Sequence, residues 1–233
     1  MKNQDYLYLD HAASTPMRKS AMDKYIEAES FGYANSSGGH KLSRNSKNLL
    51  EDSREKIAEL LNAAQGEIVF TSGGTEADNW TIKSLFNSKR PNDNLVTSNI
   101  EHEAVIASAE WVSSNGYQTK YAKSDKNGLV TKNEFLEQID NDTKVASLMW
   151  GNNETGIIQP IKDIAKEIKT INSSTLFHSD VVQGIISDNI DFHRNGIESA
   201  AISAHKIGGP KGVGAMFINC LLYTSDAADE RSS

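Results

Sequence analysis

The feature that most constrains the fold of this 233-residue chain is an alternation of short β-rich runs with helical segments. Parallel strands need a crossover of about a dozen residues between them, and a helix usually supplies it. The alternation therefore predicts an α/β fold with a mostly parallel sheet covered on both faces. We expect strands at 67–72, 94–98, 144–150, 175–180 and 199–203, and helices at 16–30, 42–63, 75–86, 101–114 and 160–171.

Charge and composition exclude several functional classes. The net charge is −7 and the isoelectric point about 5.4, and Lys and Arg form no dense cluster, so we expect neither nucleic acid nor membrane as a partner. The N-terminus lacks a signal-peptide pattern and no apolar run approaches about 20 residues, which favours a soluble, cytoplasmic protein. Cys220 is the single cysteine, and no His, Asp or Glu cluster has ligand spacing, so no metal site is expected.

The chain shows no linker-like change of composition before residue 219. We expect an N-terminal arm at 1–15 and one large domain at 16–219. The tail at 220–233, which begins CLLYTSDAADE, lacks helix or strand periodicity. That string is what a transposase sequencing adapter would encode, so we expect the native protein to continue differently beyond Asn219.

Polar residues follow the predicted strands at the points where the strands end. Ligands of such sheets bind beyond the carboxyl ends of the strands, where the strand-to-helix loops gather. These side chains, which are far apart in the sequence, are therefore expected to converge. They are Thr75, His102, Asn153, Asp180, Ser203, His205 and Lys206.

Lys206 and Asp180 together indicate a pyridine cofactor. A lysine at a strand end, near Ser203 and His205, can form a Schiff base with an aldehyde cofactor. A carboxylate about one βα unit earlier matches the partner that the ring nitrogen of pyridoxal 5′-phosphate (PLP) requires. Taken singly, Lys206 could be a surface lysine in a turn and Asp180 an exposed helix cap.

His102 could stack on a cofactor ring and move protons, or it could simply begin a helix.

The segment TSGGTEADN places two glycines and Thr75 where a strand passes into a helix. Free backbone N–H groups at such a point suit an anion such as a phosphate, although glycine pairs also serve turn geometry alone. Neither this segment nor GGPKGVG carries the GK[ST] signature of a nucleotide-binding P-loop. Binding of ATP is therefore disfavoured.

Six segments, in order and with matching spacing, resemble the cysteine desulfurases of the NifS/IscS type within the class V aminotransferase group. The segments are YLDHAASTP, EIVFTSGGTEADN, EHEAV, NNETG, HSDVVQ and SAHKIGGPKGVGA. The resemblance extends from residue 6 to about residue 219. It implies the three-layer α/β/α architecture of PLP-dependent transferases of fold type I, with the large domain present here.

The resemblance also implies roles for individual residues. Lys206 would hold PLP as a Schiff base, Asp180 would pair with the ring nitrogen, and Gln183 would bond the ring hydroxyl oxygen. His102 would stack on the ring. Thr75, Ser203 and His205 would hold the phosphate, Gly74 would allow close backbone approach, Asn153 would place the substrate carboxylate, and Asn35 would lie near the substrate.

The implied reaction removes sulfur from L-cysteine, giving L-alanine and an enzyme persulfide for iron–sulfur cluster assembly or tRNA thiolation. The implied partners are a second copy of the chain and a sulfur acceptor such as an iron–sulfur scaffold protein. In this family the thiolate and a carboxylate-binding arginine lie well beyond the lysine segment, so Cys220 does not match and we expect little turnover by the 233 residues alone. A selenocysteine lyase, another class V aminotransferase and an inactive scaffold stay open as alternatives.

Overall fold

The computed structural model describes residues 7–87, 90, 92–187 and 190–219, and within them the chain forms a seven-stranded sheet. The strand order is β1-β7-β6-β5-β4-β2-β3. Strands β6, β5, β4, β2 and β3 are parallel, whereas β7 is antiparallel to both β6 and β1. The strands are β1 (Ile68–Thr71), β2 (Asn94–Ser98), β3 (Gln118–Ala122), β4 (Thr143–Ser147), β5 (Leu176–Asp180), β6 (Ser199–Ser203) and β7 (Gly214–Ile218).

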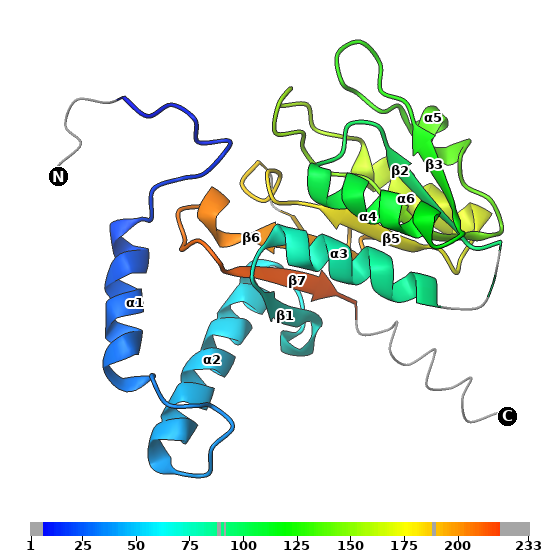
Figure 1. Cartoon of the computed structure of the whole chain (residues 1–233). Helices are drawn as coiled ribbons and strands as arrows, with labels where there is room; N and C mark the ends of the chain where they lie inside the picture. Colours follow the sequence, from blue (N-terminus) through cyan, green and yellow to red (C-terminus); the bar gives the residue numbers. More distant parts are fainter. Residues whose placement is uncertain (1–6, 88–89, 91, 188–189, 220–233) are drawn as a thin grey trace, which may run out of the picture.

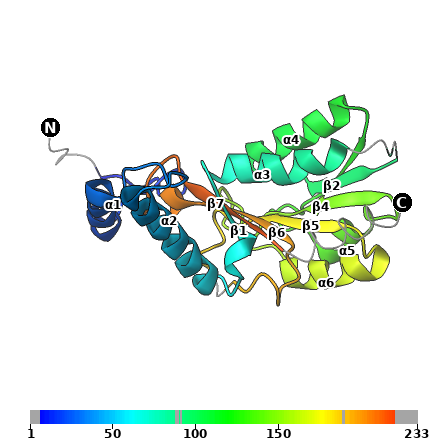
Figure 2. The ribbon, with the colours of Figure 1, turned by 90° about the horizontal axis from the view of Figure 1, so that it is seen from below.

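Helices cover both faces of this sheet, as Figure 2 shows, with α3 and α4 on one side and α5 and α6 on the other. The sheet is thus mixed and mostly parallel, which confirms the predicted three-layer α/β architecture. The helices are α1 (Lys19–Phe31), α2 (Lys41–Leu60), α3 (Gly74–Ser84), α4 (Glu103–Ser114), α5 (Lys132–Leu136) and α6 (Ile161–Ile171).

Clusters of buried apolar residues on both faces of the sheet hold the layers together. On one face Ile82 of α3 and Val105 of α4 pack over Leu95 and Val145. On the other, side chains of α5 and α6 pack against Phe177 of β5. The central strands β2 and β5 are buried along their whole length, which is the pattern expected of parallel strands covered on both faces.

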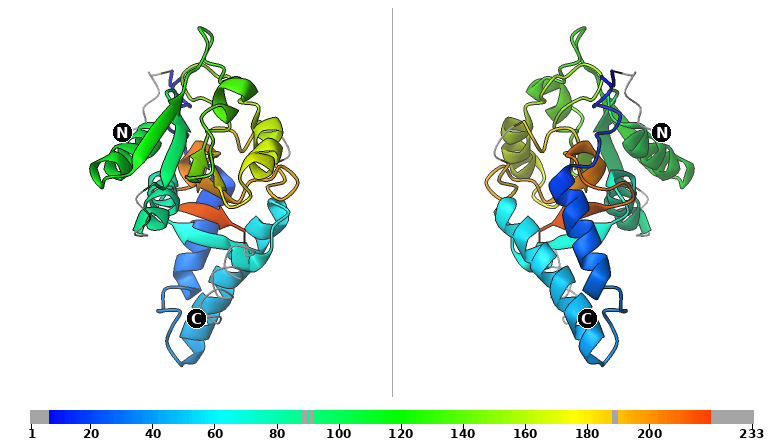
Figure 3. Two further views of the ribbon diagram at one scale, coloured as in Figure 1. Left: turned by 90° about the vertical axis from the view of Figure 1, so that its right-hand side faces the viewer. Right: turned by 90° about the vertical axis from the view of Figure 1, so that its left-hand side faces the viewer.

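Helices α1 and α2 lie side by side and extend past the edge of the sheet near β1 and β7 (Figures 1 and 3). None of the residues of α1 is buried, and Met22, Tyr25, Ile26 and Phe31 are exposed. The apolar side chains of α1 therefore face solvent in the single chain.

Five elements differ in boundary or identity from the sequence-based prediction described above. Helix α1 begins at Lys19 rather than Pro16, because the N–H of Arg18 donates to Gly208 O (2.8 Å) and holds the preceding segment extended. Helix α2 ends at Leu60 rather than residue 63, since Asn62 has a φ of +51°. Strands β3 and β7 and helix α5 were not predicted: β3 is a polar edge strand and β7 follows a glycine-rich loop.

In the described ranges, the structure contains no helix that is both long and apolar enough to cross a bilayer.

Replacing Phe177 with alanine should destabilise the fold by about 3–5 kcal/mol, because the ring is fully buried and leaves a cavity. The ring of Phe177 also packs edge-on against Phe135 at a centroid distance of 6.5 Å. Phe31→Ala on the exposed helix α1 is the matched control and should cost less than about 1 kcal/mol. Urea unfolding of the two variants measures the difference, and equal losses would contradict this assignment of the core.

Candidate active site

A cavity of about 210 Å³ lies at the carboxyl ends of β5 and β6, beside the first turn of α3. This is where ligands of open α/β sheets bind. All the sequence-predicted site residues except Asn35 line it. They are Gly74, Thr75, His102, Asn153, Asp180, Gln183, Ser203, His205 and Lys206.

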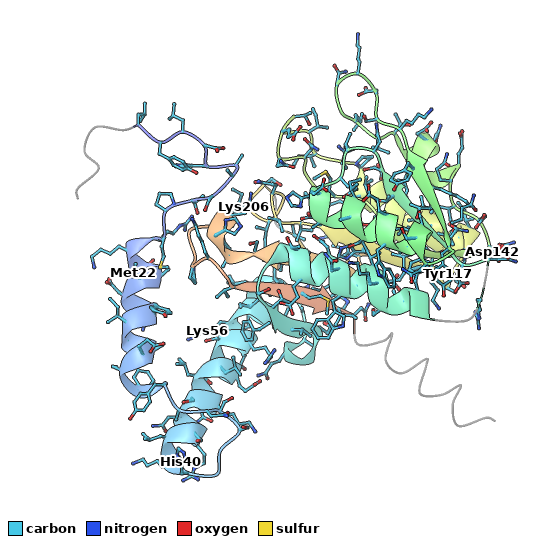
Figure 4. All side chains as sticks on the ribbon, viewed as in Figure 1. Met22, His40, Lys56, Tyr117, Asp142 and Lys206 are labelled. Atoms are coloured by element: carbon cyan, nitrogen blue, oxygen red, sulfur yellow. The ribbon has the colours of Figure 1, made fainter. Side chains whose placement is uncertain are left out.

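Asn35 lies on the loop between α1 and α2, away from the cavity. Figure 4 labels His40 at the far end of this helix pair and Lys206 near the cavity. The side chain of Asn35 is occupied locally, since its Oδ1 accepts from the N–H and the hydroxyl of Ser37 (3.0 and 2.8 Å). The single chain therefore does not bring Asn35 to the site, and its role near the substrate stays a prediction.

Asp180 is the last residue of β5 and is 5% exposed. Its Oδ1 accepts a hydrogen bond from the N–H of Val182 (2.9 Å), which fixes the carboxyl at the cavity floor. Burial raises the pKa of the Asp180 carboxyl to about 7. A bound cation would reverse this effect, because an opposite charge favours the ionised carboxylate.

Lys206 ends a single turn of 3₁₀ helix that follows β6. Burial lowers the pKa of its amine, which increases the share of the neutral, nucleophilic form. The amine donates to the carbonyl oxygen of Ala12, and the amide of Gln183 donates to the same oxygen (2.7 Å). The N-terminal arm therefore lies over the cavity entrance in this structure.

Backbone contacts tie the arm to the lysine loop. The N–H of Thr15 donates to His205 O (2.9 Å), and the N–H of Gly208 donates to the Thr15 hydroxyl (2.8 Å). His205 Nδ1 also lies 3.2 Å from Ser14 Oγ. These bonds hold the turn that carries Lys206 in a fixed place relative to the sheet.

The N-terminus of α3 forms the polar end of the cavity. Gly73 caps this helix without any side-chain hydrogen bond, so its first N–H groups remain available to an anion. In the described part of the chain, the hydroxyls of Thr75 and Ser203 donate to no side chain or backbone group. A Cβ on Gly74 would lie 2.6 Å from Val182 Cγ2, so glycine lets the helix approach the segment after β5 without displacing this side chain.

His102 caps the N-terminus of α4 and also lines the cavity. Its Nδ1 accepts from the N–H of Ala104 (3.1 Å). The neutral ring must then carry its proton on Nε2, which is the atom able to exchange a proton with a ligand. His102 therefore both caps the helix and lines the cavity, and its stacking on a cofactor ring stays a prediction.

Asn152 holds the loop that presents Asn153 to the cavity. Its Oδ1 accepts from the N–H groups of Glu154 and Thr155 (2.9 and 2.8 Å), and its amide donates to Ile100 O (2.9 Å). The loop after β4 is thereby fastened to the segment before His102.

Three buried titratable residues near the cavity were missed by the sequence analysis: Asp78, Glu101 and His178. Asp78 lines the cavity, and its Oδ1 lies 3.0 Å from His178 Nε2. Glu101 accepts from Met149 N and Ser98 Oγ (both 2.9 Å), and burial raises its pKa to about 8. Helical spacing from Thr75 and strand spacing from Asp180 were the signals that could have located Asp78 and His178.

Residues 7–225 match the family described as Aminotransferase class-V. The chain belongs to the class V aminotransferases. Cys220 and the predicted tail at 220–233 lie outside the described residues.

Curated relatives of this class V chain include a cysteine desulfurase IscS of Methanosarcina thermophila, which is 38% identical over 213 residues. A putative cysteine desulfurase IscS 1 of Bacillus subtilis is 36% identical over 212 residues. Each alignment covers 91% of this chain. It covers 52% of the Methanosarcina thermophila protein and 55% of the Bacillus subtilis protein. The chain thus spans about half the length of the curated relatives it matches.

Solved structures agree with the family assignment. A NifS-like protein superposes with a TM-score of 0.88 at 34% identity, covering 91% of this chain and 58% of the other. A structure described as SspA in complex with cysteine gives a TM-score of 0.87 at 33% identity. The superposition covers 91% of this chain and 61% of the other. These likenesses confirm the predicted fold type I architecture and the cysteine desulfurase resemblance.

Class V aminotransferases and the related desulfurases depend on PLP, and the residues present fit this cofactor. The cavity offers a helix N-terminus for the phosphate and a buried carboxyl for the ring nitrogen. Lys206 supplies an amine with a lowered pKa for the aldehyde. When bound, PLP acts as an electron sink that stabilises negative charge at the substrate Cα.

Asp180→Asn should gain stability relative to the cofactor-free wild type as the pH rises from near 5 to near 8. The folded-state pKa of Asp180, about 7, is above its unfolded value. Its stabilising contribution is therefore complete below about pH 4 and is lost as the pH rises through 7, by about 1.4 kcal/mol per unit of pKa difference. Urea unfolding at the two pH values measures the change.

Asp140→Asn is the control for this pH experiment. Burial would raise the pKa of Asp140, but hydrogen bonds from Lys120, Asn94 and Thr143 outweigh it and lower the pKa to about 2. The stabilising contribution of Asp140 is present throughout the range above about pH 4, so its variant should lose the same stability at both pH values. A pH-independent difference for Asp180→Asn as well would contradict the burial argument.

Proposed function

We propose that the protein to which this chain belongs is a PLP-dependent cysteine desulfurase. The observation that carries the proposal is the meeting of Lys206 and Asp180 in one cavity, beside an uncapped helix N-terminus that suits a phosphate. The curated relatives named cysteine desulfurase supply the substrate class. The substrate is L-cysteine, and the products are L-alanine and a persulfide.

Each cavity residue takes a role that its position supports. Lys206 holds the cofactor aldehyde, and Asp180 faces the ring nitrogen from the cavity floor. The first turn of α3, with Thr75, Ser203 and His205, receives the phosphate. Gln183 bonds the ring hydroxyl oxygen, His102 covers the ring, and Asn153 binds the substrate carboxylate.

His102 is also the proposed proton carrier near the substrate. Its ring is fixed by the hydrogen bond from Ala104 N, which leaves Nε2 to take up or release a proton. Lys206 is the second such group, because burial lowers the pKa of its amine and so eases the release of its proton. Both side chains come from loops that the sheet and the N-terminal arm hold in place.

The partners of the protein are part of the same proposal. We infer a cytoplasmic homodimer that passes sulfur to an acceptor protein such as an iron–sulfur scaffold, without contact to nucleic acid or membrane. Helix α1 supports the dimer, since Met22, Tyr25 and Ile26 are exposed on it and no described residue of the chain buries them. The acceptor thiol and the arginine for the substrate carboxylate are proposed to come from the part of the protein beyond this chain.

The full-length protein loaded with PLP should show a visible absorption band and should release alanine from L-cysteine. Borohydride reduction should attach the cofactor to Lys206, and the labelled peptide is identified by mass spectrometry. Lys206→Ala should abolish the band, the label and alanine formation, because no other amine is held in the cavity among the described residues.

Lys211→Ala is the matched control, since this exposed lysine lies five residues further along the same loop. It should keep all three signals. A label on a lysine other than Lys206, or alanine formation by the Lys206→Ala variant, would refute the proposed function. Release from selenocysteine but not from cysteine would favour the lyase alternative.

A further inference from the structure

A chain of buried hydrogen bonds leads from the cavity floor into the layer between α3 and the sheet. Asp78 Oδ1 lies 3.0 Å from His178 Nε2, and His178 Nδ1 lies 3.2 Å from Ser199 Oγ. Ser199 Oγ lies 2.7 Å from Thr81 Oγ1, which donates to Met216 Sδ at 3.3 Å. All five residues are at most 3% exposed, so the chain is shielded from bulk solvent.

The architecture fixes this chain in place. His178 precedes Asp180 by two residues on β5, so both side chains lie on the same face of the sheet. Ser199 is paired with His178 across the β5–β6 ladder. Asp78 and Thr81 lie three residues apart on α3, which places them on one side of the helix.

The chemistry at the far end determines the direction of every bond. The thioether of Met216 has no hydrogen and can only accept, so Thr81 donates its single hydroxyl hydrogen to it. Thr81 then accepts from Ser199, and Ser199 must accept from His178. His178 therefore carries a hydrogen on Nδ1.

A neutral imidazole has one donor and one acceptor nitrogen, so Nε2 of His178 accepts and Asp78 must donate. We propose that Asp78 is a protonated, uncharged carboxyl which His178 holds at the cavity floor, leaving Asp180 as the carboxylate that carries the negative charge there. The ring-facing part of this inference rests on the proposed function, whereas the protonation of Asp78 does not.

Burial acts in the same direction on both members of the pair. It raises the pKa of Asp78 to about 8 and lowers the pKa of His178 to about 4. The fully buried pair is thus more stable as a neutral acid and a neutral ring than as two ions. Asp180 on β5 and Glu101 before α4 are the other titratable groups that act on the pair, and His102 and Lys206 line the same cavity as Asp78.

An uncharged Asp78 has a consequence for its neighbour. Two ionised carboxylates in a buried site repel each other, and one of them then takes up a proton. Because Asp78 already holds its proton through His178, Asp180 can ionise when a cationic ring nitrogen arrives. Asp78 and His178 are therefore positioning residues that act through Asp180.

The tautomer of His178 in the cofactor-free protein tests the inference independently of PLP binding. Long-range ¹H–¹⁵N NMR near neutral pH should show the ring hydrogen on Nδ1 and an unprotonated Nε2. The resonance is assigned by replacing the other five of the six histidines in turn. A hydrogen on Nε2, alone or together with one on Nδ1, would overturn the inference, because Asp78 would then be the acceptor.

Asp78→Asn provides a second, charge-based readout. An amide can donate to His178 as the protonated acid does, so the tautomer should persist, and the pKa of Asp180, followed by ¹³C NMR of its carboxyl, should stay in place. A fall in the pKa of Asp180 by about one unit or more would show that a negative charge had been removed, and would overturn the inference.

Discussion

The burial of one carboxyl group, that of Asp180 at the end of the central strand β5, is the constraint on which the rest of the site depends. An isolated carboxylate is costly to bury, and the raised pKa of Asp180 expresses this cost. A cationic ring nitrogen would convert the same burial into an advantage, since opposite charges attract more strongly where water is excluded. The cavity therefore offers a buried carboxyl that a positively charged group of a ligand would stabilise.

The mostly parallel sheet brings the partners of Asp180 to the same edge. Strands β5 and β6 run side by side, so Asp180 and the turn after Ser203 open into one cavity. Helix α3 directs its N-terminus towards this cavity and supplies Asp78 at its floor. The N-terminal arm then fastens the lysine turn through Thr15 and Gly208. The N-terminus of α3, the carboxyl of Asp180 and the amine of Lys206 thus come from separate segments, and the folded sheet brings them together.

The sequence was sufficient to predict the fold class and most of the cavity, because both depend on local patterns. Strand-to-helix junctions are visible as apolar runs followed by polar residues, and Thr75, His102, Asp180 and Lys206 all occur at such junctions. Strand β3 and the pairing of Asp78 with His178 could not be predicted in this way. The first is a polar edge strand, and the second joins residues 100 positions apart through tertiary packing. Asn35 was placed near the substrate only by the family resemblance, and it lies outside the cavity of the single chain.

The charge on the bound ring nitrogen tests the central claim most directly. PLP labelled with ¹⁵N at that nitrogen should give the resonance of a protonated pyridine in the wild-type protein near neutral pH. In the Asp180→Ala variant the same nitrogen should be unprotonated. A nitrogen that is protonated in both proteins, or in neither, would contradict the view that the buried carboxyl of Asp180 sets the chemistry of this site.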